Sequence, residues 1–217
     1  MVITRRSAVA LLSASALAAC AARVEDEAAG TQTATPGETE GPFFPSTTEM
    51  ERDADLTRLA GRSERAGGQV IAVRGCLIRP DGQPVSGAQV HLWQANALGR
   101  YDHPLDAGNP NALDPNFQGY ALVQSGPDGG FSFTTIKPGG YTVREMNNAQ
   151  RTPHLHWRID ASDRRLTTQS YFPNEPANEV DFLIRAMGDP ARQLIMATGE
   201  TGPEAAAGFD WTIVLPA

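Results

Sequence analysis

Two histidines and two tyrosines are the residues of this chain whose types and positions could hold a metal ion. His154 and His156 are two of the four histidines and stand two positions apart. If their segment is a strand, both side chains point to one face, with Cβ atoms roughly 6.5 Å apart, so both imidazoles could bind one ion. Such a pair alone is more often two ordinary polar residues of a β-protein than a metal site. Further ligands are needed to favour a metal.

Tyr101 and Tyr141 are two tyrosines that stand out by position, the first in a long loop and the second at the start of an expected strand. Taken singly, each would more often be a packed tyrosine with a hydrogen-bonded hydroxyl. Deprotonating a free tyrosine at pH 7 costs roughly 4 kcal/mol, because its pKa is near 10. Two phenolates beside two imidazoles therefore favour ferric iron, whereas zinc would more naturally take histidine, cysteine or carboxylate ligands. No carboxylate stands near the histidines at the spacing typical of ferrous sites with two histidines and one carboxylate.

The other histidines are expected to have smaller roles. His91 alternates with apolar residues and is expected to be exposed on a strand, whereas His103 is expected to form hydrogen bonds within a loop. Tyr171 is expected to pack.

The elements that must position these residues are short strands. Apolar or alternating runs after residue 70 are separated by turn sequences rich in Gly, Pro, Asp and Asn. Strands are expected at residues 70–78, 88–94, 131–136, 141–146, 154–159, 167–172, 193–197 and 209–215. Weakly amphipathic helices are expected at residues 48–59 and 178–187. Many short strands of this kind indicate an all-β sandwich or barrel.

The connection between Gln94 and Gly119 contains Tyr101 and has little strand character. A long loop inside a compact β-domain is usually functional. We therefore expect this loop to belong to the site.

Six segments, in order, resemble the intradiol ring-cleavage dioxygenase family. They lie between residues 35 and 172: TPGETEGPFF at 35–44, the stretch 87–101, LDPNFQG at 113–119, TIKPG at 135–139, R-x-P-H-x-H at 151–156 and TQ-x-YF at 168–172. Residues 114–117 are most similar to the branch that contains the iron-bearing (beta) subunit of protocatechuate 3,4-dioxygenase. The resemblance covers most of the chain and is far more specific than the histidine pair.

This resemblance implies a non-haem Fe(III) enzyme that cleaves a catechol-type ring with O2 to a cis,cis-muconate-type dicarboxylate. Tyr101 and His154 would be equatorial ligands, and Tyr141 and His156 would be axial ligands. A catechol dianion would displace Tyr141, which would then act as a base.

Two further residues and the fold follow from the same resemblance. Arg151 would stabilise charge on the activated ring, and Gln169 would line the pocket. The implied fold is a transthyretin-like (prealbumin-like) β-sandwich of Greek-key type with long active-site loops and few short helices. A homo-oligomer is expected, and any partner subunit is unknown.

Two other functions remain open at this point. The chain could be a catalytically silent transthyretin-like module that binds an aromatic or carbohydrate ligand, although such a module needs no complete ligand set. It could also store or sense a metal without cleaving catechols. The physiological catechol is open as well, since Arg144 alone is a weak indication of a carboxylate partner.

The first 19 residues are expected to be a bacterial lipoprotein signal peptide. Arg5 and Arg6, which also fit a twin-arginine signal, precede an uncharged run that is too short to span a bilayer. Cleavage before Cys20 would leave an acylated cysteine, a flexible tether over residues 20–36 and a catalytic domain over residues 37–217. The protein would then be anchored in the cell envelope, and Cys76, a small buried residue, would have no intramolecular disulfide.

Charge argues against nucleic acid as a partner. Residues 1–19 hold two of the 18 basic residues and none of the 25 acidic ones, so the remaining chain has a formal net charge of about −9. Without a basic run, binding to nucleic acid or to anionic lipid surfaces is disfavoured. Any membrane attachment is expected to come from the lipid alone.

Overall fold

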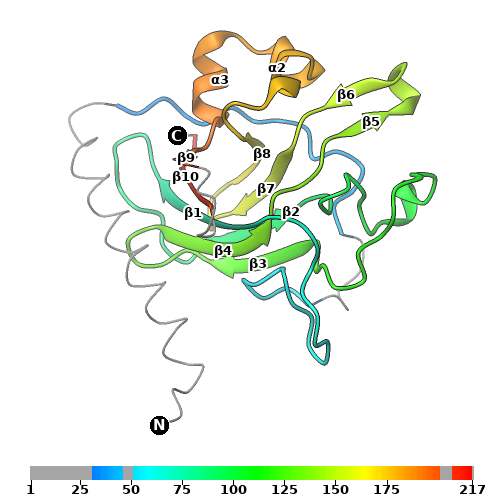
Figure 1. The fold of residues 1–217 in the computed structure, drawn as a ribbon. Coiled ribbons are helices and arrows are strands. Elements are labelled where there is room, and N and C mark those ends of the chain that lie inside the picture. The colour runs from blue at the N-terminus through cyan, green and yellow to red at the C-terminus, as the bar shows by residue number, and fades with distance from the viewer. Residues whose placement is uncertain (1–30, 46–50, 201–206, 217) are drawn as a thin grey trace.

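Two packed β-sheets form the body of the protein. The structure is a computed structural model that describes residues 31–45, 51–200 and 207–216 (Figure 1). The first sheet has the order β4-β1-β10-β9 and contains β1 (Val70–Ile78), β4 (Gly130–Ile136), β9 (Thr198–Glu200) and β10 (Ala207–Val214). The second has the order β3-β2-β7-β8 and contains β2 (Gln89–Trp93), β3 (Tyr120–Gln124), β7 (His154–Asp160) and β8 (Arg165–Tyr171). The expected all-β sandwich is confirmed.

Strand pairing follows the alternation of apolar residues. On β4, every second residue is buried, which places Phe131 and Phe133 on the inner face. β1 runs parallel to β10 and antiparallel to β4, and Arg74 and Asp210, opposite each other on β1 and β10, form an ion pair of 2.8 Å. Gly75 lies under the ring of Phe131, where an added Cβ would lie 2.1 Å from the ring. Only glycine fits that position without displacing the ring.

The core between the sheets is centred on Trp157 of β7. This side chain is fully buried, and its ring centroid lies 5.7 Å from that of Phe131, 5.8 Å from that of Phe133 and 5.3 Å from that of Trp211. Leu155 and Ile159 of β7 belong to the same cluster. Odd-numbered residues of β7 therefore face the core, and its even-numbered residues face the outside of the second sheet.

The structure corrects several expected elements. Residues 193–197, expected to be a strand, lie largely in helix α3 (Asp189–Ile195), because Pro190 in its first turn favours a helix start and a short apolar run fits helix or strand equally well. The expected strand 141–146 ends as β5 (Tyr141–Val143), followed by a 3-10 turn, η2 (Arg144–Met146). Strands β3, β6 (Ala149–Arg151) and β9 were not expected from the sequence.

The two expected helices also differ from the structure. In the expected helix 48–59, residues 51–59 are not helical, and the preceding part lies outside the described residues. The carboxylates of Asp53 and Asp55 accept backbone N–H groups two residues ahead, which competes with helix formation. The expected helix 178–187 is split into η3 (Pro176–Glu179) and α2 (Phe182–Ala186).

Cys76 contradicts one expectation. It is buried, but it is part of a disulfide rather than a free thiol. The other cysteine, Cys20, with the expected acylation site and signal peptide, lies outside the described residues. Over the described ranges, no helix is long and apolar enough to cross a membrane.

Four segments surround the outer face of the second sheet. The hairpin β5–β6 extends beyond the sheets on the side of the long β2–β3 connection, which contains η1 (Pro104–Asp106), and α2 and α3 lie above β8 (Figure 1). Residues 36–39 run beside β8: the N–H of Glu38 donates to the carbonyl of Thr167, and the amide of Gln169 donates to the carbonyl of Thr39. These segments enclose the site.

Candidate functional site

Strand β7 presents both histidines on the face away from the core. His154 and His156 are each 2% exposed. His156 lies opposite Trp93 on β2, and the two rings stack with centroids 4.9 Å apart. His154 lies opposite Tyr171 on β8. Neighbouring strands thus fix both imidazoles, as the predicted strand requires.

The two histidines meet Tyr101 and Tyr141 at one place. The Nε2 atoms of the imidazoles are 3.1 Å apart, and the Tyr101 hydroxyl lies 3.0 Å from Nε2 of His156. The rings of Tyr101 and Tyr141 meet edge to face with centroids 5.7 Å apart, and the rings of Tyr141 and His154 lie 5.6 Å apart, centroid to centroid. All four side chains named in the ligand hypothesis therefore converge.

The backbone fixes the tautomer of His154. Its Nδ1 lies 2.6 Å from the carbonyl oxygen of Thr152, and because a carbonyl only accepts, Nδ1 carries the proton. The Nε2 lone pair then points toward His156 and the tyrosines. Burial, together with the charge of Arg151, holds the pKa of His154 well below its ordinary value, so the ring is neutral. Burial also lowers the pKa of His156, to about 3.

The long β2–β3 connection places Tyr101. The backbone N–H of Tyr101 donates to the Asp106 carboxylate at 2.7 Å, and the side chain of Asn96 accepts the N–H groups of Leu98 and Arg100. The ring of Phe43 stacks on that of Tyr101 with centroids 4.3 Å apart. Tyr101 is 4% exposed. The loop that the sequence assigned to the site is thus an ordered support for this tyrosine.

Glycines bring the Tyr141 segment against the Tyr101 segment. Gly99 has a φ of +76°, and an added Cβ would lie 2.3 Å from the carbonyl oxygen of Gly140. An added Cβ on Gly139 would lie 2.6 Å from the carbonyl oxygen of Ala97. The two backbones therefore touch where side chains would separate them.

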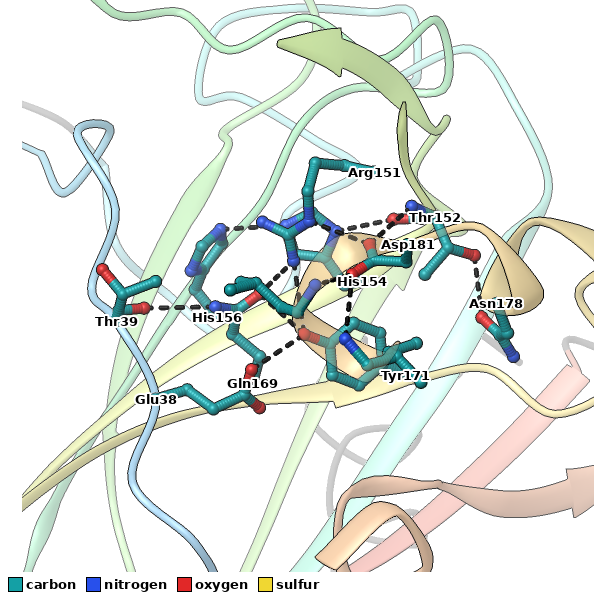
Figure 2. Close-up of polar contacts among 12 residues, drawn as sticks. Glu38, Thr39, Arg151, Thr152, His154, His156, Gln169, Tyr171, Asn178 and Asp181 are labelled. Carbon is teal, nitrogen blue, oxygen red and sulfur yellow. Dashed lines mark hydrogen bonds and ion pairs between the residues drawn. The ribbon is translucent and has the colours of Figure 1, made fainter. Parts of the chain in front are cut away.

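Arg151 is held by a buried polar network (Figure 2). Its Nε donates to Asp181 at 2.8 Å, and its guanidinium also donates to the side-chain oxygen of Gln169 at 2.6 Å. Asp181 is fully buried, caps α2 through the N–H groups of Leu183 and Ile184, and accepts the N–H of Thr152 at 2.9 Å. One carboxylate thus fixes Arg151, the start of α2 and the residue that orients His154.

Glu38 ends the same network on the far side of Tyr171. The Tyr171 hydroxyl donates to one carboxylate oxygen of Glu38 at 2.8 Å, while the other oxygen is buried with no hydrogen-bond partner among the described residues. Burial raises the pKa of Glu38 to about 7, although Tyr171 and Arg151 act in the opposite direction.

A cavity of about 980 Å³ opens over the site. Tyr141, His156 and Arg151 line it, whereas Tyr101 and His154 do not. Gln169, expected to line the pocket, does not line it either: it is fully buried and contacts Arg151. The difference arises because residue 169 lies on β8, one strand beyond His156 and beneath residue 39 of the N-terminal segment.

The residues present fit a ferric ion. No group of three or more His, Cys, Asp or Glu side chains in the described parts of the chain is placed to hold a metal, whereas two tyrosines stand beside the two histidines. Burial raises the pKa of Tyr101 well above its ordinary value and also raises that of Tyr141, so phenolates form here only beside a strong positive charge. Two neutral imidazoles and two such oxygens suit ferric iron.

Several residues of the site were not found from the sequence. Asp181 and Glu38 carry no local pattern that links them to Arg151, although an Asp directly before a helical run is a cap signal. Tyr171, expected only to pack, also donates its hydroxyl to Glu38. His91, expected to be exposed, is 5% exposed and lies 2.8 Å from the Tyr120 hydroxyl.

The structure combines a β-sandwich with a site in which two histidines and two tyrosines converge beside a buried arginine. Comparisons with known proteins identify the class of protein that has these features. The family described as Dioxygenase matches residues 39–217. The chain is 36% identical over 170 residues to a protocatechuate 3,4-dioxygenase beta chain from Burkholderia cepacia, covering 75% of this chain and 71% of that one. It belongs to the intradiol ring-cleavage dioxygenase family, as its motifs predicted.

Two more relatives extend this comparison. Catechol 1,2-dioxygenase 1 from Acinetobacter lwoffii is 31% identical over 169 residues, covering 72% of this chain and 52% of that protein, so the chain spans about half of that relative's length. One solved structure is the dioxygenase domain of a dioxygenase carbohydrate-binding protein fusion from Streptomyces sp. SirexAA-E. It has a TM-score of 0.59 and 27% identity and covers 84% of this chain and 99% of its own.

Proposed function

We propose that this protein is a non-haem Fe(III) dioxygenase that cleaves a catechol-type substrate between its two hydroxyls, using O2, to a cis,cis-muconate-type dicarboxylate. Tyr101, Tyr141, His154 and His156 would hold the iron. The observation that carries the proposal is the convergence of these four side chains beside a cavity that Tyr141 and His156 line, with the two imidazole Nε2 atoms 3.1 Å apart and the Tyr101 hydroxyl 3.0 Å from Nε2 of His156.

The iron and the protein would divide the chemistry. Bound ferric iron would supply a Lewis acid that favours the catechol dianion and draws electron density from its ring. The cavity would bind the ring beside Tyr141 and His156, the two proposed ligands that line it. Tyr101 and His154 would stay in place, because the Tyr101 backbone N–H donates to the Asp106 carboxylate and the His154 ring donates from Nδ1 to the Thr152 carbonyl.

Tyr141 is suited to receive a substrate proton. It lines the cavity and is only partly buried, and burial raises its pKa, so its phenolate is a strong base once released from a metal. A catechol hydroxyl near this oxygen would lose its proton to Tyr141. Its position at the cavity surface leaves room for the neutral tyrosine to move aside.

Arg151 is suited to stabilise negative charge on the ring. It lines the cavity, and its guanidinium is fixed by Asp181 and Gln169, so no reorganisation is needed when charge develops. Burial acts to lower the pKa of Arg151, but Tyr141, Tyr171 and the Asp181 carboxylate outweigh it and raise that pKa, so the guanidinium stays charged.

Oxygen uptake with iron analysis tests this function. The purified chain should contain one iron, show a visible tyrosinate-to-iron absorption band and consume O2 with at least one catechol while forming a muconate-type diacid. Protein that remains colourless and inactive after reconstitution with ferric iron would refute the proposal.

We also propose export and an oligomeric state. Acylation of Cys20 would anchor the chain in the bacterial cell envelope, but a thioether-linked cysteine has no thiol left for a disulfide. Acylation of Cys20 and the disulfide of Cys76 are therefore alternatives, given the two cysteines of this chain. Intact mass of protein from the membrane and soluble fractions decides between them, and light scattering tests the expected homo-oligomer.

A further inference from the structure

The cavity is much larger than a single aromatic ring requires. Its volume is about 980 Å³, whereas a cavity of about 150 Å³ is enough to hold benzene. Pockets of about 300–1,000 Å³ typically hold drug-sized ligands. A catechol ring placed against Tyr141, His156 and Arg151 would leave most of this space unfilled.

The lining away from these three residues includes four large apolar side chains among polar ones such as Asn109, Asn111 and Gln150. Phe182 and Leu183 of α2 line one side, and Leu105 of η1 and Met146 of η2 line the mouth. Leu105 is 70% exposed and Met146 is 51% exposed, and they are two of the five exposed large hydrophobic residues in the described ranges. Large apolar side chains held in water around a concave site favour an apolar ligand that covers them.

The charged groups of the cavity have protein partners, with one exception at the mouth. Asp106 accepts the N–H of Tyr101 and the amide of Asn109, and Arg151 is paired with Asp181. Arg144 is exposed, and no ion pair joins it to another described residue. Beyond the ring, the cavity therefore offers apolar contact at Phe182, Leu183, Leu105 and Met146, and Arg144 is the one charged lining residue without a protein partner among the described residues.

We propose that the substrate is a catechol with an extended apolar substituent, such as a second aromatic ring, that lies between α2 and the Leu105–Met146 mouth. This inference rests on the proposed function. The cavity is continuous from Tyr141 and His156 to Leu105 and Met146, so one molecule can reach both ends. Burying such a substituent contributes roughly 25 cal/mol per Å² of apolar surface.

The test compares kcat/KM for catechol, protocatechuate and 4-phenylcatechol. The iron-loaded chain should prefer 4-phenylcatechol at least tenfold. A Leu105→Ser/Met146→Ser variant should lose most of this preference while its kcat/KM for catechol stays within twofold. Leu98→Ser is the matched control, because Leu98 is an exposed leucine of the same connection that does not line the cavity. Anaerobic calorimetry should show the same order in binding affinity.

Three results would overturn the inference. One is equal or better cleavage of catechol or protocatechuate, which leaves the proposed function intact. Another is an unchanged preference for 4-phenylcatechol in the double variant. The last is a Leu105→Ser/Met146→Ser variant that loses its oligomeric state on size exclusion but keeps its preference for 4-phenylcatechol. Leu105 and Met146 would then contact a second copy of the chain rather than the substrate. Failure to bind iron or to cleave any catechol would instead count against the proposed function.

Discussion

The four converging side chains form two pairs that differ in how the protein holds them. Tyr101 and His154 are buried, do not line the cavity and are fixed by hydrogen bonds to Asp106 and to the Thr152 carbonyl. Tyr141 and His156 line the cavity, and Nδ1 of His156 has no hydrogen-bond partner among the described residues. The protein thus holds the first pair in fixed positions, and it places the second pair where a substrate in the cavity can contact it.

This difference parallels the roles that the family resemblance implies. The fixed pair corresponds to the implied equatorial ligands, and the cavity-lining pair to the implied axial ligands, one of which yields its place to substrate. Removing a residue of the fixed pair should therefore damage metal binding, and removing Tyr141 should damage turnover more than metal binding.

The largest effect is expected for Tyr101→Phe. The variant keeps the ring that stacks on Phe43 but lacks the only oxygen of the fixed pair. Iron content should fall sharply, and kcat/KM should drop by about a thousandfold or more, since the variant lacks a metal ligand. Iron analysis of purified protein checks this. Tyr120→Phe, which removes a tyrosine hydroxyl bound to His91 on another part of the sheet, is the control and should keep full iron content.

A smaller loss is expected for Tyr141→Phe. Three proposed ligands remain, so most of the iron should be retained, while loss of the base lowers kcat by roughly 100- to 1,000-fold. The two variants need to be compared in one preparation scheme. If Tyr141→Phe lost its iron and Tyr101→Phe kept it, the distinction between a fixed and a cavity-lining pair would be wrong.

Asp181→Asn should act on the arginine without removing a ligand. The change weakens the pairing of Arg151 and the contact that places Thr152, so kcat should fall roughly 10- to 100-fold with iron retained, as for other residues that orient a metal site. Stability should fall by about 3–5 kcal/mol because a buried charge loses its partner.

Asp210→Asn is the matched control for this change. It removes the acidic partner of Arg74 in a half-exposed ion pair far along the first sheet, and it should cost no more than about 1 kcal/mol. Chemical denaturation and steady-state kinetics measure both variants. Equal costs for the two would contradict the role given to Asp181.

The smallest effect is expected at Glu38. Its pKa is about 7 in the folded chain against 4.5 for a free side chain, so between these values the folded protein binds a proton that the unfolded chain does not. The contribution of Glu38 to the free energy of unfolding should therefore be greatest below pH 4.5. It should decrease as the pH rises to 7, by at most about 3 kcal/mol.

Glu38→Gln tests this expectation, because glutamine cannot ionise. The groups that face Glu38 are the Tyr171 hydroxyl, Arg151, Asp181 and the backbone of Gln169. The variant should lose the decrease in stability between pH 5 and pH 7 when thermal unfolding is followed over that range. An unchanged pH profile would show that Glu38 does not retain the proton.

Much of the fold was predictable because its strands have strong local patterns. Residues 70–78 match β1 at both ends, and the alternation of His154, Leu155, His156 and Trp157 gave the correct orientation of β7. The strand predicted at 193–197 is largely helix, since a short apolar run carries no periodicity that separates the two.

The convergence of the four proposed ligands was predictable, and the residues that hold them in place were not. The spacing of tyrosines and histidines carries a family pattern, but Asp181 and Glu38 reach Arg151 only through tertiary packing of α2 and the N-terminal segment. The true place of Gln169, behind Arg151 rather than at the cavity surface, also depends on the segment that covers β8. Contacts between segments more than 100 residues apart, as between Thr39 and Gln169, leave no local signal.

A titration of the metal-free chain with ferric iron, followed by visible absorption, tests the central claim most directly. We expect a tyrosinate-to-iron band that saturates at one iron per chain, weakens in Tyr141→Phe and is nearly lost in Tyr101→Phe. A chain that develops no such band, or a Tyr101→Phe/Tyr141→Phe variant that develops the same band as the unmodified chain, would contradict it.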